Sequence, residues 1–414
     1  MSGAISGKTD DFVSRPVSSG DAPPPGTSDS SIPPAVRCGL VGNAVVASLA
    51  TVSLPIMLSQ HGASKVFIAV YFVTGAVGGA VLTFTAGRLL LRAETPRPAV
   101  LLASVCAIAG VSASIAVHPI WPLYFAAVAV MCNSLGYPRL VAAAPNDDGR
   151  QLATVRQLFV FGYLVGLGLF AALSALAPGR GAALPAAAAA VVAALNGALA
   201  FLPTSRRVAT PGRRTATGAG AGPAMPAAAV ITACIAVLLM RSADSLRQVY
   251  LPLYALADGV RSALVSTLFA VTAVGELFVL APLGRLSDRH GSSRVLVGVA
   301  AAGAASSLIV WLAHGYLPLI TSQVLYAVFA AGFQSIGMVL LADLLPSGVG
   351  GGAVAYMALV QLGSTLGIVA PLAVPGYAPA LFALGALFCV VAMLLLVPPL
   401  RAETARRMRD ARNS

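Results

Sequence analysis

Charged side chains are scarce in this chain. Of its 414 residues only 10% are Asp, Glu, Lys or Arg, whereas 58% are hydrophobic. A globular domain in water carries roughly 25% charged residues, so the shortage excludes a water-soluble fold for most of the chain. It predicts an all-α membrane protein instead, because a helix of about 20 apolar residues is long enough to cross a bilayer.

Metal-binding, disulfide and nucleotide-binding patterns are also missing. The five cysteines lie in or beside apolar segments without a CxxC pair, and the four histidines have no carboxylate or cysteine at ligand spacing. These spacings predict neither a disulfide nor a metal site. No GxxxxGK[ST] string occurs, so direct use of ATP is not expected. No Ser/His/Asp arrangement suits catalysis, and we expect neither a cofactor nor an enzymatic activity.

Arginine dominates the few charges and gives the chain a net charge of +12. The arginines gather at the ends of apolar segments, and no basic region is interleaved with aromatic residues. This distribution argues against nucleic acid as a partner and for the lipid bilayer. If both termini are cytoplasmic, the outside loops hold only Lys65, Arg180 and Arg261. The asymmetry predicts a multi-pass protein of the cell (inner) membrane with cytoplasmic termini.

Twelve apolar segments follow a polar start. The Ser- and Pro-rich segment 1–34 is expected to be a disordered cytoplasmic tail. The predicted spans are 36–59, 66–87, 98–117, 120–141, 153–175, 183–203, 226–256, 263–284, 293–313, 316–341, 353–373 and 378–398. The basic linker 204–224 separates two predicted six-helix bundles, 35–203 and 225–399, and a basic cytoplasmic tail occupies 400–414.

The two predicted bundles resemble each other in sequence. Four pairs recur at a shift of 196 or 197 residues, namely Pro55 with Pro252, Gly87 with Gly284, His118 with His314, and Gly136 with Gly332. A near-constant shift indicates a duplicated six-helix unit. Proteins built from two parallel repeats of this kind place a binding site between the halves, near the middle of the membrane.

The seventh span carries three charged residues. A charge at the centre of the bilayer costs about 2.5–3.5 kcal/mol, so Arg241, Asp244 and Arg247 are expected to face a polar interior together with Gln248. Both arginines lie three residues from Asp244, the spacing of an intrahelical ion pair. Two interpretations stay open: an ionic cluster that only makes the helix insertable, or a substrate contact in which the surplus arginine binds an anionic or polyhydroxyl ligand.

Glu276 is a lone carboxyl group in the eighth span. Loss of water favours the neutral form of a carboxyl group, so Glu276 is the expected proton carrier. Asp244, beside two arginines, is the second candidate for proton coupling. The alternative for Glu276 is a purely structural hydrogen bond between helices.

Further polar side chains in the predicted spans are candidates for substrate binding. They are Arg156, Gln334, Gln361, Asn43, Tyr71, Asn133 and Tyr137. Amides and aromatic rings in one cavity suit a sugar, by hydrogen bonding and ring stacking. The alternative for Arg156 is a snorkelling side chain at the membrane interface, and for the others a hydrogen bond between helices.

The segment 284–294, GRLSDRHGSSR, resembles the loop signature of the major facilitator superfamily. The resemblance covers about 36–398. It implies the major facilitator fold, with twelve transmembrane helices in two pseudo-symmetric six-helix bundles, and a gating role for Gly284, Asp288, Arg289 and Gly291. The first half keeps only a remnant of the motif, with Leu91 at the position of Asp288, which predicts an asymmetric latch.

A narrower resemblance is to the sugar efflux transporter branch of that superfamily. It is carried by VGELF at 274–278, by the segment 323–346, and by Arg156 followed ten residues later by Gly166. It implies a monomeric secondary active transporter that exports sugars or glycosides by proton-coupled alternating access. The charged seventh span departs from the pattern of the branch. Efflux of a drug or secondary metabolite, and a non-transporting membrane sensor or scaffold, are the alternatives.

Overall fold

The computed structural model describes residues 32–90, 97–116, 120–136, 140, 149–177, 181–199, 226–345 and 348–413. The regular structure in these ranges is helical. The helices are α1 (Pro34–Gln60), α2 (Lys65–Leu90), α3 (Arg97–Ala116), α4 (Ile120–Met131), η1 (Cys132–Leu135), α6 (Gly149–Leu176), α7 (Ala183–Leu199), α8 (Ala227–Ala257), α9 (Ser262–His290), α10 (Ser292–Leu312), α11 (Tyr316–Leu344), α12 (Gly348–Val369), η3 (Ala370–Ala373), α13 (Ala380–Leu395) and α14 (Val397–Asn413).

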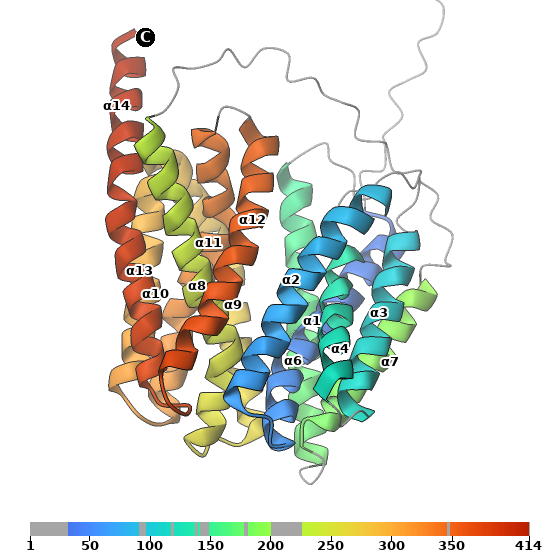
Figure 1. The fold of residues 1–414 in the computed structure, drawn as a ribbon. Coiled ribbons are helices and arrows are strands. Elements are labelled where there is room, and N and C mark those ends of the chain that lie inside the picture. Colours follow the sequence, from blue (N-terminus) through green and yellow to red (C-terminus); the bar gives the residue numbers. More distant parts are fainter. Residues whose placement is uncertain are drawn as a thin grey trace, which may run out of the picture.

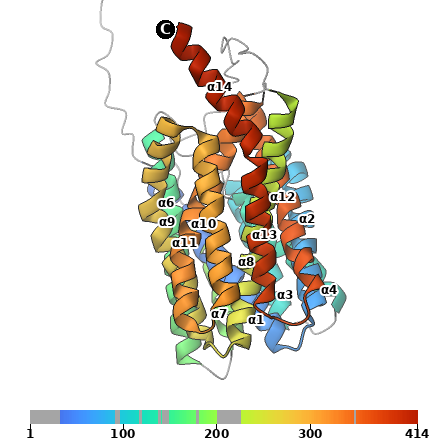
Figure 2. The same cartoon turned by 90° about the vertical axis from the view of Figure 1, so that its left-hand side faces the viewer.

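The helices form two bundles that lie side by side (Figure 1). The first contains α1 to α7 and the second α8 to α13, so each of the twelve predicted spans corresponds to one helix and the predicted fold class is confirmed. Within the described residues, nine helices are long and apolar enough to cross a membrane. The basic C-terminal segment forms a further helix, α14, which extends beyond the bundles (Figure 2).

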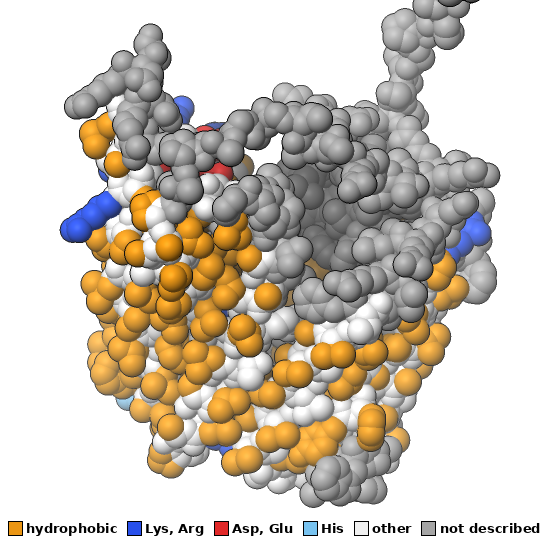
Figure 3. Space-filling model, turned by 45° about the horizontal axis from the view of Figure 1, so that its top comes forward, with side chains coloured by type: hydrophobic (Ala, Val, Ile, Leu, Met, Phe, Trp, Pro, Cys, Tyr) orange, Lys and Arg blue, Asp and Glu red, His pale blue; other side chains and the backbone are white. Residues whose placement is uncertain are grey.

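Exposed apolar side chains cover much of the described outer surface (Figure 3). Phe125 and Leu176 are each 80% exposed, and Phe278 is 75% exposed. Large exposed apolar areas of this kind would be unfavourable in water. They are the surface that a bilayer solvates.

The duplication seen in the sequence recurs in the helices. Pro55 of α1 and Pro252 of α8 lie inside their helices, each five residues before the last one. One boundary differs from the prediction: α9 continues to His290, so Asp288 and Arg289 lie on its last turn and not in a loop. The chain turns only at Gly291, whose φ of 96° favours glycine.

The apolar core is shared by the two bundles at one end of the molecule only. At the end where α2 begins, here called the Lys65 end, one buried cluster contains Leu49 and Ile56 of α1 together with Tyr250 and Leu253 of α8. At the opposite end, from which α14 projects, the second bundle has a buried cluster of its own and the first has smaller separate ones. The end from which α14 projects is called the α14 end below.

Candidate functional site

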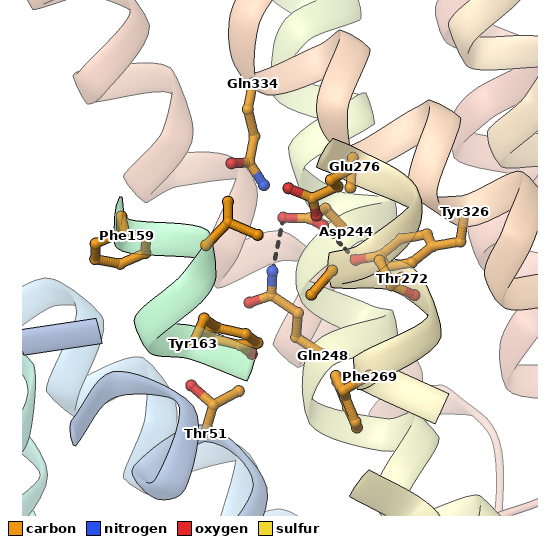
Figure 4. Close-up of a pocket in the computed structure, with 13 residues that line it drawn as sticks. Thr51, Phe159, Tyr163, Asp244, Gln248, Phe269, Thr272, Glu276, Tyr326 and Gln334 are labelled. Atoms are coloured by element: carbon orange, nitrogen blue, oxygen red, sulfur yellow. Dashed lines mark hydrogen bonds between the residues drawn. The ribbon is translucent and has the colours of Figure 1, made fainter. Parts of the chain in front are cut away.

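A cavity with about 770 Å³ of empty space lies between the bundles. Its walls come from five helices, α1, α6, α8, α9 and α11 (Figure 4). The polar lining residues are Thr51, Tyr163, Asp244, Gln248, Thr272, Glu276, Tyr326 and Gln334.

Asp244 is the most enclosed charged group of this cavity, with no exposed surface. Its Oδ2 accepts hydrogen bonds from Arg241 Nη1 and, at 3.1 Å, from Gln248 Nε2. Its Oδ1 accepts a hydrogen bond from the Tyr326 hydroxyl on α11. A buried carboxylate is stable only when a cation and additional donors satisfy it, and these three residues from two helices meet that requirement.

Arg247 takes a different direction from Arg241. It is 2% exposed. Its Nη2 donates to Ser322 Oγ at 2.6 Å, and its Nη1 donates to Ser306 Oγ at 3.3 Å. The guanidinium lies 4.5 Å from the centre of the Tyr326 ring. Arg247 therefore joins α8 to α10 and α11, behind the cavity, and its position favours a structural role.

Glu276 reaches the same cavity from α9. Figure 4 shows its carboxyl group and that of Asp244 directed to one region, with Gln334 across from them. Both carboxyl groups come from the second bundle, Asp244 on α8 and Glu276 on α9. One turn earlier, Thr272 Oγ1 donates to Gln323 Oε1 at 2.8 Å, which ties α9 to α11. The wall that holds Glu276 is therefore fixed by a polar contact of its own.

A second cavity, with about 800 Å³ of empty space, adjoins the first and shares Thr51 and Gln248 with it. It lies between α2 of the first bundle and α8 and α12 of the second. Arg241, Ser245, Gln361 and Ser364 supply its polar wall. The remaining wall is largely apolar, formed by Phe72, Ala76, Met131, Val249, Val360 and Ile368.

The polar residues expected in the first bundle lie elsewhere. Asn43 Nδ2 donates to Asn133 O at 2.9 Å and to Asn133 Oδ1 at 3.2 Å, so this buried pair joins α1 to η1. The Tyr71 hydroxyl is fully buried and lies 3.0 Å from Ser114 Oγ. None of the three residues lines either cavity. Tyr137 and the side chain of Arg156 lie outside the described part of the structure.

The gating motif lies at the α14 end, where α9 passes into α10. Gly284, Asp288 and Arg289 are exposed on α9. The backbone N–H of Ser293 in the first turn of α10 donates to Glu403 Oε2 of α14 at 3.1 Å. An acid near a helix N-terminus is stabilised by the free N–H groups and the helix dipole. Glu403 thus supplies a carboxylate at the start of α10.

The Lys65 end is closed by a contact between the bundles. The Lys65 ammonium donates to the carbonyl oxygens of Pro371, Val374 and Gly376 at 2.7, 2.6 and 2.7 Å. It also lies 5.5 Å from the ring centre of Tyr250 and 5.9 Å from that of Tyr377. An ammonium group has three N–H donors, so this clamp satisfies all of them across the interface.

Three of these contacts were missed by sequence reasoning. Tyr326 precedes Gln334 by eight residues on α11, a spacing that places both near one helical face, so periodicity was a usable signal. Lys65 is one of only two lysines in the chain, but the scarcity of lysine does not indicate that its partners lie more than 300 residues away. Glu403 likewise contacts a distant segment, and no local pattern points to it.

Comparison with known proteins bears mainly on the second bundle. The family model described as Major Facilitator Superfamily matches residues 233–413. No curated protein matches this sequence.

Solved structures similar to this chain include transporters of low sequence identity. A point mutant of the nucleoside transporter NupG has a TM-score of 0.71 at 10% identity, covering 87% of this chain and 98% of its own. NupG itself has a TM-score of 0.69 at 12% identity, covering 89% and 98%. A mutant of the peptide transporter POT in complex with sulfate has a TM-score of 0.67 at 12% identity, covering 89% and 94%. With two six-helix bundles, a matching family model over the second bundle and these structural neighbours, the chain has the major facilitator fold.

Proposed function

We propose that this protein belongs to the major facilitator superfamily and is a proton-coupled secondary transporter that works by alternating access. The observation that carries the proposal is the pair of carboxyl groups, Asp244 and Glu276, in a cavity between two bundles. The bundles share an apolar core only at the Lys65 end. Two bundles that share a core at one end and enclose a cavity between them match one of the two states that alternating access requires.

The α14 end is assigned to the cytoplasm. The arginine-rich segments support this assignment, because basic residues favour the cytoplasmic side, and α14 carries Arg401 and Arg406. The state described here is then open to the inside. Lys65 is the outer gate in this proposal, because its clamp must break before the outer end opens.

Glu276 is assigned as the proton carrier. Asp244 is already engaged by a cation and two other donors. Glu276 faces the same space from α9 (Figure 4). Protonation of Glu276 relieves repulsion between the two carboxyl groups. Proton binding therefore changes the charge of the cavity that holds the cargo.

The cargo is proposed to be a sugar or glycoside that the protein exports. Gln248, Gln334 and Thr272 line the first cavity, where Tyr163 adds an aromatic ring. Amides and hydroxyls donate and accept hydrogen bonds, as a polyhydroxyl ligand requires. The sequence likeness to the sugar efflux branch supports the same cargo class.

The test is uptake into liposomes that contain the purified full-length protein in mixed orientation. Radiolabelled sugars and glycosides are supplied with and without an imposed proton gradient, and a cationic dye is the comparison cargo. Sugar or glycoside uptake that depends on the gradient supports the proposal. Transport of the dye alone favours a drug exporter. Transport of neither contradicts a transport function and favours a sensor or scaffold.

A further inference from the structure

We infer that the second cavity binds a negatively charged group of the cargo, so that the substrate is an amphipathic acid such as an acidic glycoside with an apolar aglycone. This inference deepens the proposed function and rests on it. The first cavity offers groups for a neutral polyol, whereas the second joins a guanidinium to an apolar wall. The two cavities meet at Thr51 and Gln248, so one molecule can occupy both.

Arg241 has donors to spare in this second cavity. Its Nε donates to Ser364 Oγ at 2.7 Å, and its Nη1 donates to Asp244. A guanidinium has five N–H donors in a planar fork that matches a carboxylate. Three donors therefore have no partner among the described residues, and the side chain keeps 20% exposure where it lines the cavity.

The contacts of Arg241 also orient its free edge. Ser364 on α12 and Asp244 on α8 hold two sides of the guanidinium, so the group does not lose much conformational freedom when a ligand binds. Asp244 is held in addition by Tyr326 and Gln248. The Arg241 ion pair thus does not need to break for the remaining donors to bind a second anion.

Ser245 provides an independent sign of a missing polar partner. It is 3% exposed, lines the second cavity, and its hydroxyl makes no hydrogen bond in the described structure. An unsatisfied buried hydroxyl is unfavourable by about 1–3 kcal/mol. A carboxylate or a hydroxyl of the cargo would satisfy it, and the Gln361 amide on the facing helix lines the same space.

The rest of the wall specifies the other end of the cargo. Phe72 and Met131 from the first bundle face Val249 and Ile368 from the second across this cavity. A freely water-soluble sugar gains little from such a surface, whereas an aromatic or aliphatic aglycone buries apolar area there. Because both bundles contribute, the apolar part of the cargo contacts each of the two moving units.

The experiment uses two commercial fluorescent compounds that share one aglycone. 4-Methylumbelliferyl β-D-glucuronide carries a carboxylate at the position where the corresponding glucoside carries a hydroxymethyl group. Binding of each to the purified full-length protein is measured by equilibrium dialysis. We expect the glucuronide to bind roughly 10- to 100-fold more tightly, the range for a charge-assisted hydrogen bond.

Two variants localise the preference. Gln361→Glu places a tethered carboxylate in the cavity beside Arg241, and we expect the affinity for the glucuronide to fall about tenfold relative to the affinity for the glucoside. Arg241→Gln combined with Asp244→Asn removes both members of the ion pair together, and the preference for the glucuronide should disappear. Arg261→Gln removes an exposed arginine of the Lys65 end and should leave the preference unchanged.

Each outcome decides the inference. Equal affinity of the wild type for both compounds, or a preference that survives both cavity variants, overturns the anion site. If the glucoside is nevertheless transported in a proton gradient, the proposed function stands without it. Binding of neither compound also overturns the inference, and the liposome assay then decides the transport function separately.

Discussion

Helices α1 and α8 are counterparts in the two bundles, and they differ most in charge. Both begin at the α14 end and carry a proline five residues before their last residue. At the repeat shift of 197 residues, Arg241, Asp244 and Arg247 of α8 correspond to alanines in α1. These alanines are Ala44, Ala47 and Ala50. The helix is duplicated, whereas the three charges at these positions occur only in the second copy.

The packing around the two helices is also duplicated. A Cβ atom on Gly162 of α6 would lie 2.5 Å from the Val41 carbonyl oxygen of α1, and one on Gly363 of α12 would lie 2.5 Å from the Leu238 carbonyl oxygen of α8. In each case a second glycine follows four residues later. Close approach of two helices requires small residues at the contact. Both copies therefore require close helix packing. The charges of α8 are additional: Arg241 and Asp244 line the cavities, and Arg247 contacts the neighbouring helices.

The largest effect on transport is expected when Glu276, the proposed proton carrier of the second bundle, loses its carboxylate. Glu276→Gln keeps the shape and a hydrogen-bonding group but cannot carry a proton. We expect proton-driven transport in liposomes to fall to the level of liposomes without protein, while the thermal unfolding temperature stays near that of the wild type. Unchanged transport in a proton gradient would remove Glu276 from the mechanism.

The duplicated packing predicts matched losses of stability in the two bundles. Gly166→Ala on α6 would place a methyl group against Ser48 and Val45 of α1, and Gly367→Ala on α12 would place one against the Ser242 carbonyl of α8. Overpacking of this kind costs typically ~1–3 kcal/mol. We expect both variants to lower the thermal unfolding temperature in detergent.

The control for the glycine variants lies on the same helix. A Cβ atom on Gly168 would have no neighbouring atom within 4 Å, and alanine favours a helix over glycine by roughly 1 kcal/mol. Gly168→Ala should therefore be neutral or slightly stabilising. If only one of Gly166→Ala and Gly367→Ala lowers the thermal unfolding temperature, the packing of α1 and α8 is not equivalent.

A smaller effect is expected at the contact that joins the bundles. Lys65→Met removes three hydrogen bonds to carbonyl oxygens and should open the Lys65 end. The measurement is labelling of Thr51→Cys in the cavity by a membrane-impermeant maleimide added from that side, in a background without the native cysteines. We expect labelling to be at least about tenfold faster, since even one such bond contributes ~1.5–3 kcal/mol.

Lys65→Arg is the matched variant, because it retains the charge and N–H donors. Its labelling rate should stay closer to that of the parent protein than the rate of Lys65→Met. Equal labelling of Thr51→Cys with and without Lys65 would contradict a gate at this position.

The smallest effect on transport is expected in the first bundle. Asn43→Ala removes the side-chain contacts between α1 and η1, which should lower stability by ~1 kcal/mol. Because Asn43 lines neither cavity, substrate affinity should remain within twofold. A selective loss of affinity without a loss of stability would place the first bundle in direct contact with the cargo.

Much of the fold was predictable from the sequence, and less of the site. The apolar runs predicted twelve helices, because each spanning helix satisfies its own backbone hydrogen bonds and needs an apolar surface. The spacing from Asp244 to Arg241 and Gln248 predicted neighbours on one helix, and the structure shows those contacts. Local periodicity did not separate Asn43 and Tyr71, which bind neighbouring helices, from Gln248 and Gln334, which line the cavity.

Composition and periodicity by themselves determined that this chain crosses a membrane as twelve helices, since these properties depend only on neighbouring residues and on the solvent. Tertiary structure alone decided that Tyr326 completes the shell of Asp244, that Arg247 turns away from the cavity, and that Lys65 closes one end. The physical reason is that a buried polar group is stable only with partners, and the partners of these three residues lie on helices distant in sequence.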